Sequence, residues 1–576
     1  MNIKKQPDFV LIENYYPGFQ LFVVGKQRFY GDFFGQNIIS FFAKFDTLLY
    51  SLQYVLRFFI NFLLLIKIFC FLKFFIYFYG VNSYTNFIYS KLPQPHKWKF
   101  WIGVAIIVKT LFFVYKLYEP HFPNTIYTGT FAIDSSDTIS YIEPIENLLN
   151  HGTYSDDFRM PGYGWIYFLF RLVFNQLVSL NLLVVFQLLL SSVSVFILAL
   201  IAKSIFQKNL AFYLTFIIYC ISTYVSLFDN QLLTESFCTS AIIFSTWFLV
   251  KFIENNNTKN IILSGLMLTW AIFLRPVIFP LLFLFSLYLL VVIRKNNQLR
   301  KSGWKIIIYF LLPFFLIDGY WIIRNYQHHN GIYPLTRTIY YPGAYNSCFF
   351  ELDNFVRAFG GSTIFWQPGA EITFFKPTPA YIKRKIEVKF PAYIYTSKFN
   401  YDSLLVLRDS LKELNKPETS MERQKNITDF LKNKSRAYTL SIKKEKPFLY
   451  YVSSKFILLK TFFIHSGTYN LFNKASFELN KFEYVIKIFY SMLYLSIVIL
   501  GFSGCIFMNA IAIKEKDYLP ILIALIGLYI AIVFPFLFKS DEARYFVPGY
   551  PFFVIASVFV IMRLLVFFKI KFLKNV

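Results

Sequence analysis

Six carboxylates stand within one polar stretch of the sequence, FAIDSSDTISYIEPIENLLNHGTYSDDFRMPGYGWIYFLF, which follows an apolar segment. Carboxylates can act as general bases, although most acids in loops are simply solvated. Asp137 is set apart by its surroundings, because Tyr141 follows four residues later and apolar side chains then continue one helical face to Leu149. We expect a helix over 138–150 that begins at Asp137, ends at Gly152 and holds the carboxylate in a fixed place. The six are Asp134, Asp137, Glu143, Glu146, Asp156 and Asp157.

Ionisable residues also stand at the ends of other apolar stretches. Glu235 comes directly after Thr234 at the start of one. An acid there needs a partner or a water-lined cavity, although it can also simply cap a helix. Arg275 separates two apolar stretches, and Arg324 and Arg544 stand beside others. A snorkelling arginine explains Arg275 alone, whereas a membrane-embedded anion such as a lipid phosphate would explain all three arginines.

The composition indicates what kind of protein positions these residues. Of the 576 residues, 56% are hydrophobic, 22% are aromatic and 16% are charged, and the mean hydropathy is +0.48. These values exclude the soluble and disordered classes and indicate a polytopic membrane protein. The net charge of +26 falls largely in short loops between apolar stretches and in one long polar segment. It therefore reflects membrane topology rather than binding to nucleic acid.

Ten apolar segments are near the roughly 20 residues that a membrane-spanning helix requires. Lysine and arginine gather in alternate short loops, and the positive-inside rule assigns those loops to the cytoplasm. The other connections then lie outside and hold almost every candidate residue: 119–182, 229–232, Arg275–Pro276, 324–483 and 539–545. The ten expected spans are 100–118, 183–202, 210–228, 233–253, 260–274, 277–293, 306–323, 484–510, 519–538 and 546–568.

Two apolar segments are expected to lie along the membrane surface instead. If residues 161–178 crossed the membrane, the basic loop at Lys203 would lie outside. We therefore expect 161–178 to form an interfacial helix that starts at Pro161. Residues 455–466 indicate a second one, and residues 33–80 either lie in the cytoplasmic interface or cross once. The expected fold is an all-α polytopic membrane protein of about 10–11 transmembrane helices.

Hydropathy divides the chain into four regions. Residues 1–97 form an amphipathic, membrane-associated region, and 98–337 form a transmembrane module that includes the first outer loop. Residues 338–483 form an extracytoplasmic segment, in which the spacing of leucines predicts helices around 402–437. Residues 484–576 form the C-terminal transmembrane helices.

Several other kinds of site are excluded by the sequence. It contains no GxxxxGK(S/T), no GxGxxG and no HExxH motif, which excludes ATP-driven transport and zinc-protease chemistry. The five cysteines and six histidines show no ligand spacing. No cofactor is therefore expected, and a divalent metal is compatible with the sequence but has no dedicated site.

The candidate residues belong to motifs that occur in a fixed order along the chain. These are Asp137-(x3)-Tyr141; Gly152, Tyr154 and Arg159-Met-Pro-Gly-Tyr163; Thr234-Glu235; Arg275-Pro276; Trp321-(x2)-Arg324-Asn325-Tyr326; and Arg544-Tyr545-(x2)-Pro548. In this order and on these sides of the membrane, they resemble the dolichyl-phosphate-mannose-protein mannosyltransferase superfamily, including the bacterial aminoarabinose lipid A transferase-like enzymes. The resemblance covers roughly residues 98–335 and 484–568, and it departs at Gly164, where the family commonly has proline.

This resemblance implies a GT-C glycosyltransferase, which transfers a sugar from a polyprenyl-phosphate carrier to an acceptor hydroxyl on the outer side of the membrane. By position, Asp137 would be the general base, with Asp134 in reserve. Glu235 would hold the acceptor or a cationic partner. Tyr141 and Arg159 would complete the motif of the first loop.

The same resemblance implies how the donor binds. Arg544, next to Tyr545 and supported by Arg275 or Arg324, would bind the phosphate that leaves with the polyprenol. The implied partners are a polyprenyl-phosphate-linked sugar, membrane lipid and an acceptor protein, lipid or glycan, and no nucleic acid. The implied location is a bacterial inner membrane, with the site on the periplasmic face.

Other functional classes share some of these features. A transporter or flippase of a lipid-linked saccharide predicts ionisable residues near the middle of spans and an inverted repeat, and we expect neither. A polysaccharide polymerase or ligase shares the long outer loops but lacks the early aspartate motif. A structural scaffold would leave the outer arginines and Glu235 unexplained. Arg544 can also pair with Asp541 or Glu542 of its own loop, a surface contact worth roughly 0 to 1 kcal/mol.

Overall fold

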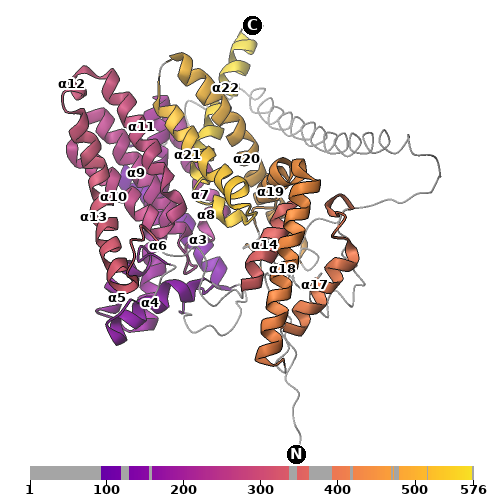
Figure 1. Cartoon of the computed structure of the whole chain (residues 1–576). Helices are drawn as coiled ribbons and strands as arrows, with labels where there is room; N and C mark the ends of the chain where they lie inside the picture. Colours follow the sequence, from indigo (N-terminus) through magenta and orange to yellow (C-terminus); the bar gives the residue numbers. More distant parts are fainter. Residues whose placement is uncertain are drawn as a thin grey trace, which may run out of the picture. The chain divides into compact units, whose positions relative to one another are not determined.

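Apolar stretches of membrane-spanning length become helices because a helix satisfies its backbone hydrogen bonds within the segment. The computed structural model describes residues 93–118, 129–135, 137–154, 159–336, 347–361, 392–414, 419–468, 471–472, 479–515 and 517–573. This part of the chain is mainly helical (Figure 1), and its β contacts are two isolated bridges, Ile133 with Gln231 and Thr396 with Phe399. The predictions for 33–80 lie outside the described residues.

The described residues contain eight helical segments long and apolar enough to cross a membrane and two shorter apolar helices, α7 (Asn209–Ile221) and α10 (Thr258–Leu274). Each coincides with one of the expected spans, which confirms the all-α polytopic fold. The eight are α3 (Trp98–Tyr118), α6 (Gln176–Phe206), α9 (Glu235–Asn255), η1 with α11 (Pro276–Ile278 and Pro280–Lys295), α13 (Gly303–His329), α20 (Lys481–Glu515), α21 with the π-helical turn η5 (Leu519–Val533 and Phe534–Phe538) and α22 (Tyr550–Leu573). The short helices α8 (Thr223–Ser226) and α12 (Asn297–Arg300) lie in connections.

Small and hydroxylated residues bring the central helices close together, as is usual where helices pack in a membrane. Helix α10 packs along both α9 and α13. Between α9 and α10, Ser245 and Ser264 each donate a hydroxyl hydrogen bond to the other's carbonyl, at 2.9 and 2.8 Å. Between α10 and α13, a Cβ on Gly265 would collide with the backbone of Phe310. Helices α20, α21 and α22, at the yellow end of the colour scale in Figure 1, pack against one another as a second group.

A buried lysine joins α3 to the loop that precedes α9. The ammonium group of Lys109 is 2.9 Å from Oδ2 of Asp229 and also donates to the hydroxyls of Ser191 and Ser226. Oδ1 of Asp229 accepts from the hydroxyl of Ser236 at 2.7 Å. Both charged residues are buried, and Lys109 lies near the middle of an expected span. The expectation that no ionisable residue would occupy such a position was therefore wrong.

Breaking this buried pair should destabilise the protein strongly. Lys109→Met leaves the Asp229 carboxylate buried without its counter-ion, and the expected loss in unfolding free energy is about 3–5 kcal/mol. Thermal unfolding in detergent measures the loss. The double variant Lys109→Met/Asp229→Asn removes both charges and should recover a large part of the stability. A double variant as unstable as the single one would show that the charge pair is not the cause.

The first loop contains two helices, as expected, but the second is shorter than expected. Helix α4 (Thr138–His151) has Asp137 as its N-cap and ends at Gly152, which has a φ of 73°. Helix α5 runs only from Gly164 to Arg171 instead of over 161–178. Asn175 then caps α6, its side chain accepting from Val178 N–H at 2.9 Å, so that the next long helix begins earlier than expected. At 1.5 Å per residue, α5 is too short to cross a membrane.

The polar segment after α13 has a helical core of its own. Helices α14 (Ser347–Ala358), α17 (Tyr401–Leu414) and α18 (Met421–Glu445) bury a shared set of apolar side chains that includes Leu352, Phe355, Leu407 and Leu431. The helices expected around 402–437 are thus confirmed. The turn η3 (Ala392–Ile394) precedes them, and the π-helical turn η4 (Leu449–Ser453) and α19 (Ser454–Phe463) follow.

Candidate active site

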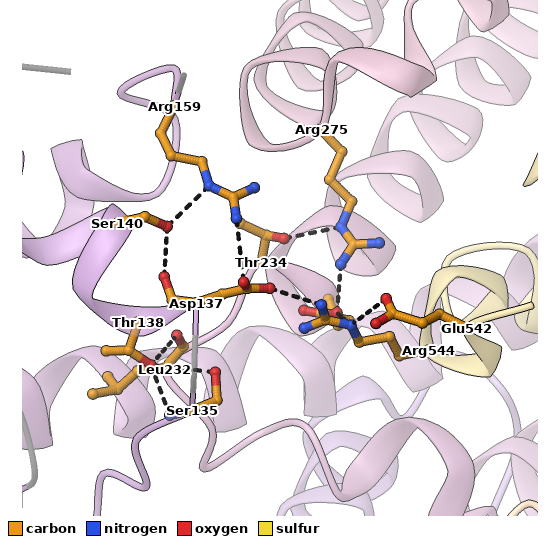
Figure 2. Close-up of polar contacts among 11 residues, drawn as sticks. Ser135, Asp137, Thr138, Ser140, Arg159, Leu232, Thr234, Arg275, Glu542 and Arg544 are labelled. Carbon is orange, nitrogen blue, oxygen red and sulfur yellow. Dashed lines mark hydrogen bonds and ion pairs between the residues drawn. The ribbon is translucent and has the colours of Figure 1, made fainter. Parts of the chain in front are cut away.

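Four of the predicted site residues come from four separate parts of the chain. Asp137 precedes α4, Glu235 is the first residue of α9, and Arg275 is the C-cap of α10. Arg544 lies in the 3₁₀ turn η6 (Ala543–Phe546), between η5 and α22. Figure 2 shows Asp137, Arg275 and Arg544 pointing toward one another. The structure therefore brings together residues from the first and last parts of the chain.

Asp137 contacts two arginines through its two carboxylate oxygens. Oδ2 is 2.7 Å from Nη2 of Arg544, and Oδ1 is 3.5 Å from Nη2 of Arg159. Ser140 steadies the second contact, because its hydroxyl accepts from Nε of Arg159 at 3.0 Å and donates to the carbonyl of Asp137 at 2.6 Å. The Asp137 side chain is 28% exposed, so it is not sealed within the protein.

Glu235 lies deeper and connects two of the arginines. Its side chain is fully buried, and Oε1 accepts a hydrogen bond from Nη2 of Arg275 and lies 3.9 Å from Nε of Arg544. Nε of Arg275 donates to the hydroxyl of Thr234 at 2.9 Å. A buried carboxylate is tolerated only with such partners. Glu235 therefore faces two arginines of the site, Arg275 and Arg544.

Arg544 contacts three carboxylates. Besides Asp137 and Glu235, its Nε is 3.1 Å from Oε2 of Glu542. Burial alone would lower the pKa of Arg544, but Glu542 and Asp137 raise it well above its ordinary value, so the guanidinium stays charged. The contact with Glu542, considered from the sequence as an alternative, thus occurs together with the contacts across the site. We use the name ion cluster for Asp137, Arg159, Glu235, Arg275, Glu542 and Arg544.

Aromatic rings support the arginines of the ion cluster. The guanidinium carbons of Arg275 and Arg544 each lie 5.3 Å from the centre of the Tyr545 ring. Tyr545 in turn stacks on Phe534, with 4.5 Å between ring centres. Arg159 lies 4.4 Å from the ring centre of Tyr141, a distance suited to a cation–π contact. The tyrosines of the first and last motifs therefore fix the orientation of the charged groups.

The Pro-Gly-Tyr motif of the first loop positions the end of α10. Gly162 packs directly on the backbone of Phe273 and Leu274, where a Cβ would not fit. Nε1 of Trp270 donates to the carbonyl of Gly162 at 3.0 Å. These contacts lie immediately before Arg275, so the motif holds this arginine in place. A glycine is required here because the two backbones approach so closely.

The acidity of Asp137 predicts a pH dependence. Burial alone would raise its pKa, but the guanidinium groups of Arg544 and Arg159 outweigh burial and hold the pKa below the ordinary 3.8. A general base acts in its ionised form. If Asp137 is the general base that the motifs imply, kcat/KM for a polyprenyl-phosphate sugar should stay constant between roughly pH 5 and 7, as far as this group is concerned, and fall only below about pH 4. A pH–rate profile measures this, and a loss centred near about pH 6 that Asp137→Asn abolishes would contradict it.

Arg324 contacts the first loop at Tyr154, between α4 and α5. Its Nη2 donates to the carbonyl of Tyr154, its Nη1 donates to Oδ1 of Asn325 at 3.0 Å, and it lies 4.8 Å from the ring centre of Trp321. Nε1 of Trp321 donates to the carbonyl of Leu335 at 2.6 Å. The Trp-Arg-Asn motif thus ties α13 to the first loop and to the chain that follows α13.

Asp134 lies in a short segment beside the connection between α8 and α9. The neighbouring Ile133 donates its N–H to the carbonyl of Asn230 at 2.8 Å and accepts from the N–H of Leu232 at 2.9 Å. Oδ1 of Asp134 is buried and has no hydrogen-bond partner among the described residues. The contacts that define the ion cluster involve Asp137 and not Asp134.

Two members of the site were not assigned a role from the sequence. Ser140 stands three residues after Asp137, a spacing that brings side chains together on a helix, so its contact had a local signal. Glu542 was considered only as a surface partner of Arg544. Glu542 shares Arg544 with Asp137 and Glu235 because the turn η6 meets the first loop and the start of α9 in space, for which the sequence has no local signal.

The described residues contain no group of three or more His, Cys, Asp or Glu side chains that could hold a metal ion. The three carboxylates of the ion cluster each contact at least one arginine. Such cationic neighbours do not suit a divalent cation, which prefers a shell of oxygen ligands.

Comparison with solved structures finds two of the oligosaccharyltransferase of Archaeoglobus fulgidus. One is in the apo form, with 12% sequence identity, a TM-score of 0.41 and a match that covers 82% of this chain and 52% of that one. The other, AglB with an inhibitory peptide and a dolichol-phosphate, has 12% identity, a TM-score of 0.40 and coverage of 83% and 52%. The chain thus spans about half the length of the solved structures that it matches. No curated protein matches significantly.

Comparison with protein families gives a match to the model described as dolichyl-phosphate-mannose-protein mannosyltransferase, over residues 159–321. The matched region begins at Arg159 and includes Glu235 and Arg275. It ends at Trp321, the first residue of the Trp-Arg-Asn motif. Over residues 159–321, this match confirms the resemblance to the dolichyl-phosphate-mannose-protein mannosyltransferases that was predicted from the motifs.

Proposed function

We propose that this protein transfers a sugar from a polyprenyl-phosphate carrier to an acceptor hydroxyl on the extracytoplasmic side of the membrane. The observation that carries the proposal is the meeting of Asp137 and Arg544, 2.7 Å apart and both partly exposed. A glycosyl transfer from a lipid phosphate requires a base for the acceptor and a cation for the leaving phosphate at one place. These two residues supply both.

The reaction follows from their chemistry. Asp137 accepts the proton of the acceptor hydroxyl as its oxygen bonds to the anomeric carbon of the sugar. The bond between that carbon and the phosphate oxygen breaks, and its electron pair leaves with the polyprenyl phosphate. Arg544, with Arg275 beside it, stabilises the negative charge that grows on the phosphate. The proton then passes from Asp137 to water.

The other residues of the ion cluster support this pair. Glu235 holds Arg275 and approaches Arg544, so its proposed role is to position the arginines. Arg159 holds the second oxygen of Asp137 and keeps the base oriented while Arg544 binds the phosphate. Tyr141 and Tyr545 brace these groups. Asp134 is the reserve candidate for the base.

The sidedness follows from the charges of the loops. The basic short loops, such as the one at Lys203 and Lys208, belong in the cytoplasm by the positive-inside rule. The connections that form the ion cluster then face the opposite side, which in a bacterial inner membrane is the periplasm. There the acceptor can be a protein, a lipid or a glycan, and the donor needs a lipid carrier because nucleotide sugars remain in the cytoplasm.

The test is a transfer assay with purified protein in lipid vesicles. Radiolabelled sugars on polyprenyl phosphate should be consumed, with release of polyprenyl phosphate and label on an acceptor fraction, whereas nucleotide sugars should not react. A flippase would move the intact donor across the bilayer without cleaving it. The assay is repeated with a panel of sugars and of cell-envelope acceptors. If the donor crosses the bilayer in these assays and is never cleaved, the proposal is overturned.

A further inference from the structure

The edge of Arg544 that would grip a phosphate is already engaged by carboxylates. Nε and Nη2 of an arginine point the same way and form the fork that binds a phosphate through two parallel hydrogen bonds. In this structure, Nη2 is 2.7 Å from Asp137 and Nε is 3.1 Å from Glu542. Two different acids therefore share the fork. A donor phosphate that binds there must displace both of them.

We propose that the donor phosphate replaces Asp137 and Glu542 at Arg544, and that this exchange releases Asp137 to accept the proton of the acceptor. The proposal rests on the function proposed above and adds an order of events to it. The donor binds first, and Asp137 is withheld from the acceptor until it does. A carboxylate held by a guanidinium has fewer lone pairs available for a hydroxyl proton.

The released base stays in its place. Arg159 contacts the other oxygen of Asp137 at 3.5 Å, and Ser140 ties Arg159 to the start of α4. Asp137 is the N-cap of that helix. Losing Arg544 therefore removes one of two charged contacts and leaves the carboxylate oriented. Glu235 is fully buried and keeps its own contact with Arg275 during the exchange.

The exchange also makes Asp137 a stronger base. The charged and titratable groups that face it are Arg544 and Arg159, with Arg275, Glu235 and Tyr141 behind them. Bound phosphate neutralises Arg544 and adds negative charge nearby, and both changes favour the protonated form of Asp137. Its affinity for a proton therefore rises at the stage of the reaction when it must take one.

Binding of farnesyl phosphate, a short polyprenyl phosphate, tests the exchange. The purified full-length protein in detergent is titrated with it, and each variant is first checked by thermal unfolding. Asp137→Asn and Glu542→Gln remove a competitor for Arg544 and should each bind the phosphate more tightly, by about tenfold for a charge-assisted contact. Glu146→Gln is the matched control, since Glu146 lies in α4 and pairs with Arg171 instead, at 2.8 Å. It should bind as the wild type does.

A double-mutant cycle separates the exchange from a general effect of charge. In an Arg544→Ala background, Asp137→Asn should no longer tighten binding, because the contact for which both compete is absent. Tightening that persists in this background would overturn the proposal, as would unchanged affinity in both single variants. Farnesol should show none of these differences, and inorganic phosphate should show the same order at weaker affinity. A farnesol affinity that changes with Asp137→Asn would show that the effect comes from binding of the isoprenoid chain and not of the phosphate, and it would also overturn the proposal.

Failure of the exchange and failure of the proposed function give different results. If Arg544→Ala binds farnesyl phosphate as tightly as the wild type, the donor site itself has been misplaced. If Arg544→Ala loses binding while Asp137→Asn and Glu542→Gln match the wild type, the donor site stands and only the exchange is wrong.

Discussion

Asp137→Asn is expected to lower the rate of sugar transfer by about 10²–10⁴, the usual contribution of a general base. Asparagine keeps the size and shape of the side chain but cannot accept the proton. The rate is measured as release of polyprenyl phosphate from a polyprenyl-phosphate sugar, at saturating donor and acceptor. The protein should remain folded, because Asp137 is partly exposed and the asparagine oxygen can still accept a hydrogen bond from a neighbouring arginine.

The control for this prediction is the neighbouring aspartate. Asp134→Asn alters a carboxylate in the same loop that is not part of the ion cluster, and it should retain most of the activity. If Asp137→Asn transfers sugar at the wild-type rate while Asp134→Asn does not, the base has been assigned to the wrong aspartate. The contact of Arg544 with Asp137 would then only stabilise the first loop.

Arg544→Ala is expected to lower kcat/KM for the donor by about 10²–10³, the range found when a group that stabilises the leaving charge is removed. Its side chain is one-fifth exposed, and Tyr545 supports the position of its guanidinium. Arg544→Lys supplies the charge without the fork and should recover only part of the loss. A titration of the donor measures the effect in both variants.

The matched control is an arginine with a similar surrounding outside the ion cluster. Arg171 pairs with Glu146 at 2.8 Å, and Arg171→Ala should leave the donor dependence unchanged. An unchanged donor dependence in Arg544→Ala would reduce Arg544 to a structural residue. The phosphate role would then pass to Arg275 or Arg324, of which Arg275 already lies in the ion cluster.

The spans could be predicted because hydropathy is a local signal. An apolar segment of membrane-spanning length forms a helix wherever it occurs, so the segments from α3 to α22 were found without knowledge of their neighbours. The start of α4 was equally local, because Asp137 and Gly152 mark the two ends of the helix. The length of α5 could not be predicted from a local signal. Its apolar residues continue into α6, and only the cap at Asn175 separates the two helices.

The geometry of the site could be predicted only in part. The charges of the short loops predicted that Asp137, Glu235, Arg275 and Arg544 lie on one side of the membrane, which made a common site possible. The sequence could not show that Asp137 and Arg544 form an ion pair, since this depends on the packing of α22 against helices from the first half of the chain.

The buried pair of Lys109 and Asp229 was missed for a different reason. Lys109 stands in an otherwise apolar span, and a charge in that position is a signal for a buried partner. The acids cluster in the outer loops, so the residue that carries this signal is the basic member of the pair. Asp229, the partner of Lys109, lies in the loop just before Glu235 and accepts from Ser236. The pair therefore also stabilises the segment that leads to Glu235.

The most direct measurement is an experimental structure of the protein in lipid with polyprenyl phosphate bound. The phosphate oxygens should lie about 2.7–2.9 Å from Nε and Nη2 of Arg544, the distance of a charge-assisted hydrogen bond. Asp137 should have separated from Arg544 and should remain beside Arg159, facing the position of the sugar. A phosphate bound at Arg324, or elsewhere with the pair of Asp137 and Arg544 intact, would contradict the proposed active site.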